Sequence, residues 1–214
     1  NGLSGIGASF DGQYTTDYNM TSSFDVEYFD KNFNISHTGF LKRNNLKKIK
    51  LNFKINKNRN SLPRLVRSLA INIYTKYEQN LDNILLDKYI GVSVLSNFVN
   101  NYYINSSYIH QFERFNDRML FDYKDQILQS KSPLSVEPEQ FGLIFEMGTD
   151  PNKSLSANSN LAYVKNTLGD ITLASGIKLN YYTDNSSLSI NWNRTTADQS
   201  YYWLDIFDEI SYYD

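Results

Sequence analysis

Apolar side chains occupy every second position of this chain in one window after another. The clearest window is 48–56, where Ile49, Leu51, Phe53 and Ile55 alternate with lysine and asparagine. Successive side chains of a β-strand point to opposite faces, so this window predicts a ribbon with one apolar and one polar side. Because the pattern recurs along the whole chain, it predicts an all-β fold.

The windows with this period of two define the expected strands. They are residues 5–14, 20–29, 47–57, 68–78, 88–98, 102–113, 141–149, 155–165, 170–183 and 186–194. Short connections with Asp, Asn or Pro lie at 15–19, 99–101, 150–154 and 184–185, and longer ones at 30–46, 79–87 and 114–140. The segment 59–67 fits the short class loosely. Alternation of short turns and long loops is typical of an up-and-down barrel of antiparallel strands.

Composition excludes several classes of protein. No apolar run is long enough for a membrane helix, so any crossing of a bilayer would use strands. A net charge of -2 does not point to nucleic acid, whose recognition normally needs a basic face, and the lack of cysteine rules out disulfides and cysteine metal sites. The first residues lack a signal-peptide pattern and residue 1 is not Met, so we expect a processed chain or a segment of a longer polypeptide.

A period of two alone also fits a soluble β-sandwich. The predicted strands are nevertheless long enough to cross a bilayer at a tilt, and aromatic residues gather near their ends, as at Tyr28 and Phe29. We therefore predict an antiparallel up-and-down transmembrane β-barrel, as a segment of a larger barrel. Residues 1–195 would form about ten strands of it, and 196–214 an aromatic and acidic terminal strand or loop. The alternative is a soluble or surface-displayed all-β module that binds glycan or protein through Tyr and Trp.

Two stretches resemble a known family. Residues 34–45 contain Gly-Phe-Leu-Lys-Arg-Asn, and residues 112–118 read Phe-Glu-Arg-Phe-Asn-Asp-Arg. They resemble elements of a family of bacterial outer-membrane barrels of unassigned function, in which a sandwich similar to carbohydrate-binding modules precedes a C-terminal barrel. The resemblance covers about residues 20–195. It departs from the family after 118, where Met119 to Tyr123 replace a Gly-rich loop, and the sandwich is absent from this chain.

These observations predict a bacterial outer-membrane protein, either a porin-like channel or a membrane-embedded subunit of an envelope assembly. Its partners would be the lipid bilayer and, further, lipopolysaccharide or other envelope proteins, with no nucleic acid and no cofactor. The predicted lumen-facing residues are Lys48, Lys50, Lys54, Asn72, Lys76, Lys178 and Asn180. The predicted lipid-facing residues are Ile49, Leu51, Phe53, Ile55, Ile71, Ile73, Val92, Val94 and Leu179. The lysines would favour anionic or neutral solutes in an open pore.

Signals for catalysis are weak, and we predict that the protein is not an enzyme. His37 and His110 are the only histidines, and solitary histidines usually serve packing or a local hydrogen bond. A hydrolase would need His110 beside Ser106 or Ser107, but positions 106 and 110 lie about 13 Å apart along a strand. No metal site is predicted: the final carboxylates (Asp198, Asp205, Asp208, Glu209 and Asp214) are more simply solvated. Arg114 and Arg118 lie in the longest loop. They would make useful contacts if this loop folded into the lumen or bound the phosphates of lipopolysaccharide.

Overall fold

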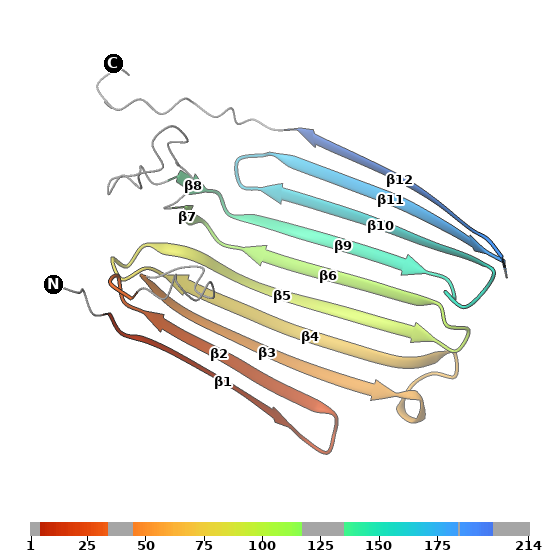
Figure 1. Cartoon of the computed structure of the whole chain (residues 1–214), viewed down its shortest axis with the longest axis horizontal. Coiled ribbons are helices and arrows are strands. Elements are labelled where there is room, and N and C mark those ends of the chain that lie inside the picture. The colour runs from red at the N-terminus through yellow and green to blue at the C-terminus, as the bar shows by residue number, and fades with distance from the viewer. Residues whose placement is uncertain (1–4, 34–44, 117–134, 184, 199–214) are drawn as a thin grey trace.

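One antiparallel sheet makes up most of the chain. The structure, a computed structural model, describes residues 5–33, 45–116, 135–183 and 185–198. Ten strands lie side by side in the order in which they occur along the chain (Figure 1). They are β1 (Gly7–Thr15), β2 (Met20–Phe29), β3 (Leu46–Asn58), β4 (Val66–Gln79), β5 (Leu85–Phe98), β6 (Tyr103–Gln111), β9 (Gln140–Gly148), β10 (Leu155–Asn166), β11 (Ile171–Tyr182) and β12 (Ser187–Asp198).

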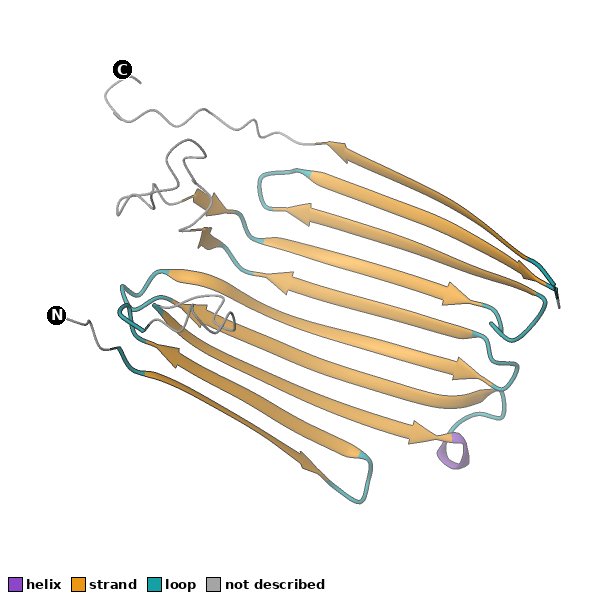
Figure 2. Ribbon diagram, in the orientation of Figure 1, coloured by secondary structure: helices purple, strands orange, loops and turns teal. Residues whose placement is uncertain are grey.

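Two small elements lie outside this sheet. The hairpin of β7 (Arg114–Asn116) and β8 (Ser135–Glu137) emerges between β6 and β9, and a 3-10 turn, η2 (Arg59–Ser61), lies between β3 and β4 (Figure 2). Neither was predicted, because three residues are too few to show a period. Among the residues described, no helix has the length and apolar character needed to span a membrane.

The all-β, antiparallel part of the fold prediction is confirmed, and every predicted window forms a strand. The sheet is open in the described residues: β1 and β12 are its two edges and do not pair with each other. β12 runs to Asp198, past the predicted boundary at residue 195, and residues 199–214 lie outside the described residues.

Cross-strand pairing sorts the side chains onto two faces. Ile49 lies opposite Val26 and Tyr77, whereas Lys50 lies opposite Asp25 and Lys76. Directly opposed residues share a face, and the same two faces continue from β1 to β12, with register shifts only at the two ends of the β4–β5 pairing. We call the face of Ile49 the apolar face and the face of Lys50 the polar face.

The connections separate into two rims. The turn rim carries the connections 16–19, 59–65, 99–102, 149–154 and 183–186, so the segment near Pro63 belongs with the short turns. The loop rim carries 30–45, 80–84, 112–139 and 167–170. The predicted long loop at 79–87 is wrong, because β5 already begins at Leu85. Asn19, Asn83 and Asn101 take positive φ angles in these turns, a conformation that asparagine tolerates better than most residues.

Candidate functional site

The apolar face has no protein layer over it in the described part of the chain. Leu51, Ile73 and Trp192, from three different strands, are 50%, 44% and 51% exposed. The only buried hydrophobic side chains among the described residues are Leu46 and Leu86, both next to the loop rim. A large uncovered apolar surface marks an interaction site, because soluble monomers rarely expose one of this extent. The apolar face is therefore the first candidate functional surface.

All of the predicted lipid-facing residues lie on the apolar face. These are Ile49, Leu51, Phe53 and Ile55 of β3, Ile71 and Ile73 of β4, Val92 and Val94 of β5, and Leu179 of β11. The register places them on one surface. That this surface meets lipid stays a prediction.

Carboxylates avoid the apolar face. Within β1 to β11 of the ten-stranded sheet, every Asp and Glu lies on the polar face: Asp11, Asp25, Glu27, Glu78, Asp87 and Glu146. The sole exception in the sheet is Asp198, the last residue of β12, at the loop rim. Unpaired anions are costly to remove from water, so this distribution fits a polar face that stays hydrated and an apolar face that does not.

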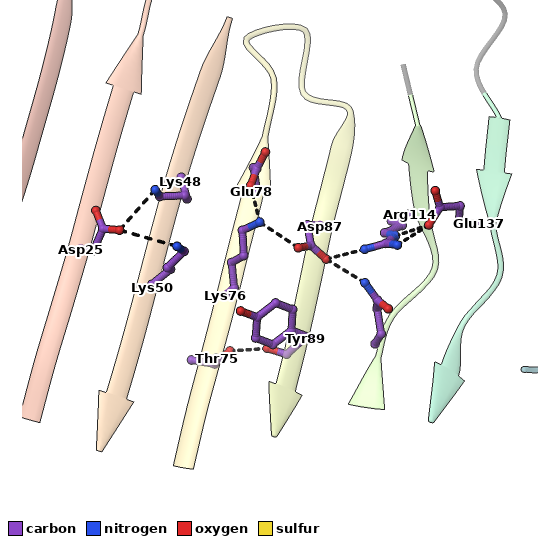
Figure 3. Close-up of polar contacts among 11 residues, drawn as sticks. Asp25, Lys48, Lys50, Thr75, Lys76, Glu78, Asp87, Tyr89, Arg114 and Glu137 are labelled. Atoms are coloured by element: carbon purple, nitrogen blue, oxygen red, sulfur yellow. Dashed lines mark hydrogen bonds and ion pairs between the residues drawn. The ribbon is translucent and has the colours of Figure 1, made fainter. Parts of the chain in front are cut away.

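A set of ion pairs links the polar face of β4 and β5 to the hairpin of β7 and β8. Lys76 Nζ lies 2.5 Å from Glu78 Oε2 and 2.8 Å from Asp87 Oδ2 (Figure 3). Arg114 extends the network, because its Nη1 lies 3.0 Å from Asp87 Oδ1 and its guanidinium also pairs with Glu137. The side chain of Lys76 is only 17% exposed, so the two carboxylates, rather than bulk water, stabilise its charge.

A second set of ion pairs joins β2 to β3. Lys48 Nζ lies 3.2 Å and Lys50 Nζ 3.9 Å from Asp25 Oδ2 (Figure 3). Lys48 also pairs with Glu27. The sequence predicted lysines that would attract anions, but two of them, Lys48 and Lys76, are held by two carboxylates each. In the described part of the chain, Lys54 and Lys178 have no carboxylate partner, so the uncompensated positive charge of the predicted set lies there.

All of the predicted lumen-facing residues lie on the polar face. These are Lys48, Lys50 and Lys54 of β3, Asn72 and Lys76 of β4, and Lys178 and Asn180 of β11. Among the described residues, the side-chain oxygen of Asn72 is buried and has no hydrogen-bond partner. That these residues line a lumen stays a prediction.

The polar face changes character from β9 to β12, where amides replace ion pairs. A hollow of about 210 Å³ is lined there mainly by polar residues of β9 to β12 and by Tyr103 of the neighbouring β6: Tyr103, Glu146, Asn158, Ser159, Asn160, Gly176, Ile177, Lys178, Asn191 and Asn193. Gly176 forms part of the floor, and the side-chain oxygens of Asn160 and Asn193 lean over it. This hollow offers donors and acceptors with little net charge.

Polar contacts also tie neighbouring turns of the turn rim together. Arg67 donates to the side-chain oxygen of Asn101, and Asn101 Nδ2 donates to Asp150 Oδ2 at 3.0 Å. The backbone N–H of Asn152 donates to the same carboxylate. These hydrogen bonds, led by that of Asn101, lower the pKa of Asp150 below its ordinary value because they stabilise the charged form.

The structure does not assemble the hydrolase considered above. His110 lies on the apolar face between Ile90 and Phe141, stacks on Phe112 and hydrogen-bonds Glu139. Ser106 lies on the same face as His110, but its cross-strand neighbours are Val94 and Phe145. Ser107 lies on the polar face. His37 lies outside the described residues.

The predicted acidic and basic loop clusters are mostly outside the described residues. Of these clusters, only Asp198 and Arg114 are described. Arg114 is engaged with Asp87 and Glu137, which sequence reasoning missed because they lie far from it along the chain. Within the described ranges, no three His, Cys, Asp or Glu side chains form a group able to hold a metal ion.

Comparison with known proteins leaves the family open. Residues 34–44 of the first family-like stretch lie outside the described residues, and the second stretch contributes β7. No protein-family model, no curated protein and no solved structure matches the chain. The resemblance to outer-membrane barrels therefore stays a prediction.

Proposed function

We propose that this sheet is part of the wall of a β-barrel in a bacterial outer membrane, acting as a porin-like channel or as a membrane-embedded subunit of an envelope assembly. The observation that carries the proposal is the apolar face, which extends over all ten strands and is uncovered in the described residues. In the proposed barrel this face contacts lipid and the polar face lines the interior.

Lipid explains the apolar face better than a second protein layer does. Strands β3, β4, β5, β10, β11 and β12 have 12 to 14 residues, longer than the usual globular strand and sufficient to cross a bilayer at a tilt. The confinement of carboxylates to the polar face also matches the alternation of lipid-facing and interior residues in barrels.

A membrane location requires the sheet to close. Water is absent from the bilayer core, so the free backbone groups along β1 and β12 would be left unpaired there. The proposed barrel closes either by pairing β1 with β12 or by adding strands from outside the described residues. In both cases the closed wall would have no edge.

The polar face would set what passes through an open pore. The ion-paired region near the loop rim has nearly balanced charge, and the hollow from β9 to β12 is rich in amides. Lys54 and Lys178 would then give a weak preference for anionic over cationic solutes. Neutral polar solutes would meet hydrogen-bonding groups along the wall.

Tryptophan fluorescence tests the proposal, because Trp192 lies on the apolar face and Trp203 is the only other tryptophan. The full chain carrying Trp203→Phe would be folded into phospholipid vesicles with or without bromine on the acyl chains, which quenches tryptophan on contact. We expect strong quenching by brominated lipid and weak quenching by aqueous acrylamide.

The matched control moves the tryptophan by one residue to the polar face. In a chain with Asn191→Trp, Trp192→Phe and Trp203→Phe, we expect the reverse: acrylamide quenches and brominated lipid does not. A chain that stays monodisperse in buffer without detergent, with Trp192 untouched by brominated lipid, would overturn the proposal.

A soluble or surface-displayed glycan-binding module is the second candidate, favoured by the amide-rich hollow from β9 to β12. Amides both donate and accept hydrogen bonds, which suits the hydroxyl groups of a sugar. This candidate predicts detergent-free solubility and loss of glycan binding in Asn160→Ala. The same fluorescence experiment separates the two functions.

A further inference from the structure

Three lysines lie on the apolar face near the loop rim. Lys47 is the second residue of β3, Lys88 the fourth residue of β5 and Lys165 the last but one of β10. Their cross-strand neighbours, Tyr28, Tyr77 and Phe141 respectively, identify the face. At the other end of this face the described residues include a single lysine, Lys57 of β3.

These lysines differ from those of the polar face in their partners. Lys48 and Lys76 each contact two carboxylates, whereas none of Lys47, Lys88 and Lys165 pairs with a carboxylate in the described ranges. Lys88 Nζ instead lies 4.2 Å from the centre of the Phe112 ring. Their positive charge is therefore open to an anion from outside the sheet.

We propose that Lys47, Lys88 and Lys165 form a phosphate-binding band that holds the apolar face against the headgroups of anionic lipids at the loop rim. This inference rests on the proposed function, because it needs the apolar face to be in a bilayer. A lysine near the end of a membrane strand can lay its aliphatic stem along the apolar surface and place its ammonium among the headgroups.

The spacing of the band favours a lipid surface over a single free phosphate. Lys47 and Lys88 lie two strands apart, and Lys88 and Lys165 three strands apart through β6 and β9. Neighbouring strands are separated by about 4.8 Å, so the lysines stand about 10 and 14 Å apart across the sheet. One phosphate cannot span these gaps, whereas a layer of headgroups presents a phosphate to each lysine.

The tyrosine opposite Lys88 provides a local reporter. In a chain with Tyr77→Trp, Trp192→Phe and Trp203→Phe, the only tryptophan lies directly across from Lys88. This chain would be folded into phosphatidylcholine vesicles that contain a minor fraction of phosphatidylglycerol. Bromine would be placed on the acyl chains of either lipid in turn, so quenching reports which lipid sits beside the tryptophan.

We expect brominated phosphatidylglycerol to quench more, per molecule, than brominated phosphatidylcholine. A basic residue near the membrane surface is worth about fivefold in local preference for an anionic lipid, so Lys88→Gln should remove most of the difference. High salt should weaken the preference by screening. The matched control Lys54→Gln removes the same charge from the polar face of the same sheet and should leave the preference unchanged.

A second reporter variant allows the same test if the first variant does not fold. Phe141→Trp in the same tryptophan-free background lies opposite Lys165, and Lys165→Gln is its partner variant. Equal quenching by the two brominated lipids at both reporters would overturn the band while leaving the membrane proposal intact. Quenching by neither lipid would overturn both. Loss of the preference on adding inorganic phosphate, but not chloride of equal ionic strength, would show a site for free phosphate and would also overturn the band.

Discussion

Lys76 and Lys88 are side chains of one type on adjacent strands, yet their surroundings are opposite. Lys76 lies on the polar face between Glu78 and Asp87, and Lys88 lies on the apolar face over the ring of Phe112. On the polar face the lysine is neutralised by fixed carboxylates, whereas on the apolar face no carboxylate of the described residues pairs with it. The difference indicates that water and counter-charges belong to the polar face and that the apolar face is adapted to another medium.

The largest expected effect comes from placing a cation in the middle of the apolar face. Leu51→Arg should lower the free energy of unfolding in lipid vesicles by about 2–4 kcal/mol, because a charge at the bilayer centre loses its hydration. Leu69→Arg, on the same face near the turn rim, should cost only about 0–1 kcal/mol. Denaturant titration of the vesicle-bound chain measures both.

A substitution at the next residue of β3 controls for the effect of placing an arginine in this strand. Asn52→Arg, on the polar face next to Leu51, should change the unfolding free energy by no more than about 0.5 kcal/mol. Equal costs at Leu51 and Leu69 would indicate a packed protein layer rather than lipid over this face.

The next effect sharpens the contrast between the two lysines directly. Lys76→Met removes the cation that pairs with Glu78 and one of the two that pair with Asp87, which keeps Arg114, and we expect a loss of about 1–3 kcal/mol in unfolding free energy. Lys88→Met should cost less than about 1 kcal/mol in vesicles of neutral lipid, because only a cation–π contact is lost. Unfolding curves for the two variants in the same vesicles measure both losses of free energy. Equal losses would contradict the proposed difference between the two faces.

An effect of similar size tests how the polar face packs an aromatic ring. Tyr74 lies over Gly91 of the neighbouring strand, and a methyl group at residue 91 would come within 2.4 Å of the ring. Gly91→Ala should destabilise the sheet by about 1–3 kcal/mol through overpacking. In a chain that already carries Tyr74→Ala, Gly91→Ala should change the stability very little. Thermal unfolding of the original chain, the two single variants and the double variant measures this coupling.

The smallest effect concerns pH at the turn rim. Because the pKa of Asp150 is lowered in the folded chain, its contribution to stability is present above the ordinary pKa and is lost as pH falls through the folded value. Asp150→Asn should therefore lower the free energy of unfolding near neutral pH and have little effect at acidic pH, so that the stability profiles of the two chains converge as the pH falls. Unfolding measured from neutral to acidic pH gives both profiles, and parallel profiles would contradict the role of Asp150.

The strands were predictable from the sequence because their signal is local. The alternation of apolar residues from Ile49 to Ile55 is visible within one window of the sequence. The cross-strand pairing confirms that the neighbouring strands continue the same apolar face. The start of β5 was missed because Asp82 and Asn83 resemble a longer loop, although they form a turn in which Asn80 accepts hydrogen bonds from two backbone N–H groups.

The partners of the charged side chains were not predictable in the same way. Lys76 meets Asp87 because a turn brings β5 beside β4, and Arg114 meets Glu137 across a long excursion of the chain. Such pairs depend on cross-strand register, which a single window does not contain. For that reason the sequence suggested free lysines on the polar face, and the structure places carboxylates beside three of them, Lys48, Lys50 and Lys76.

The most direct test of a lipid-facing apolar side is a spin-label scan of β3. The chain has no cysteine, so single cysteines can be placed in turn at residues 48–55 and labelled. In lipid vesicles we expect labels at 49, 51, 53 and 55 to collide with dissolved oxygen but not with a water-soluble nickel complex, and labels at the even positions to show the opposite. Odd positions shielded from both reagents would place them inside a protein core and contradict the account.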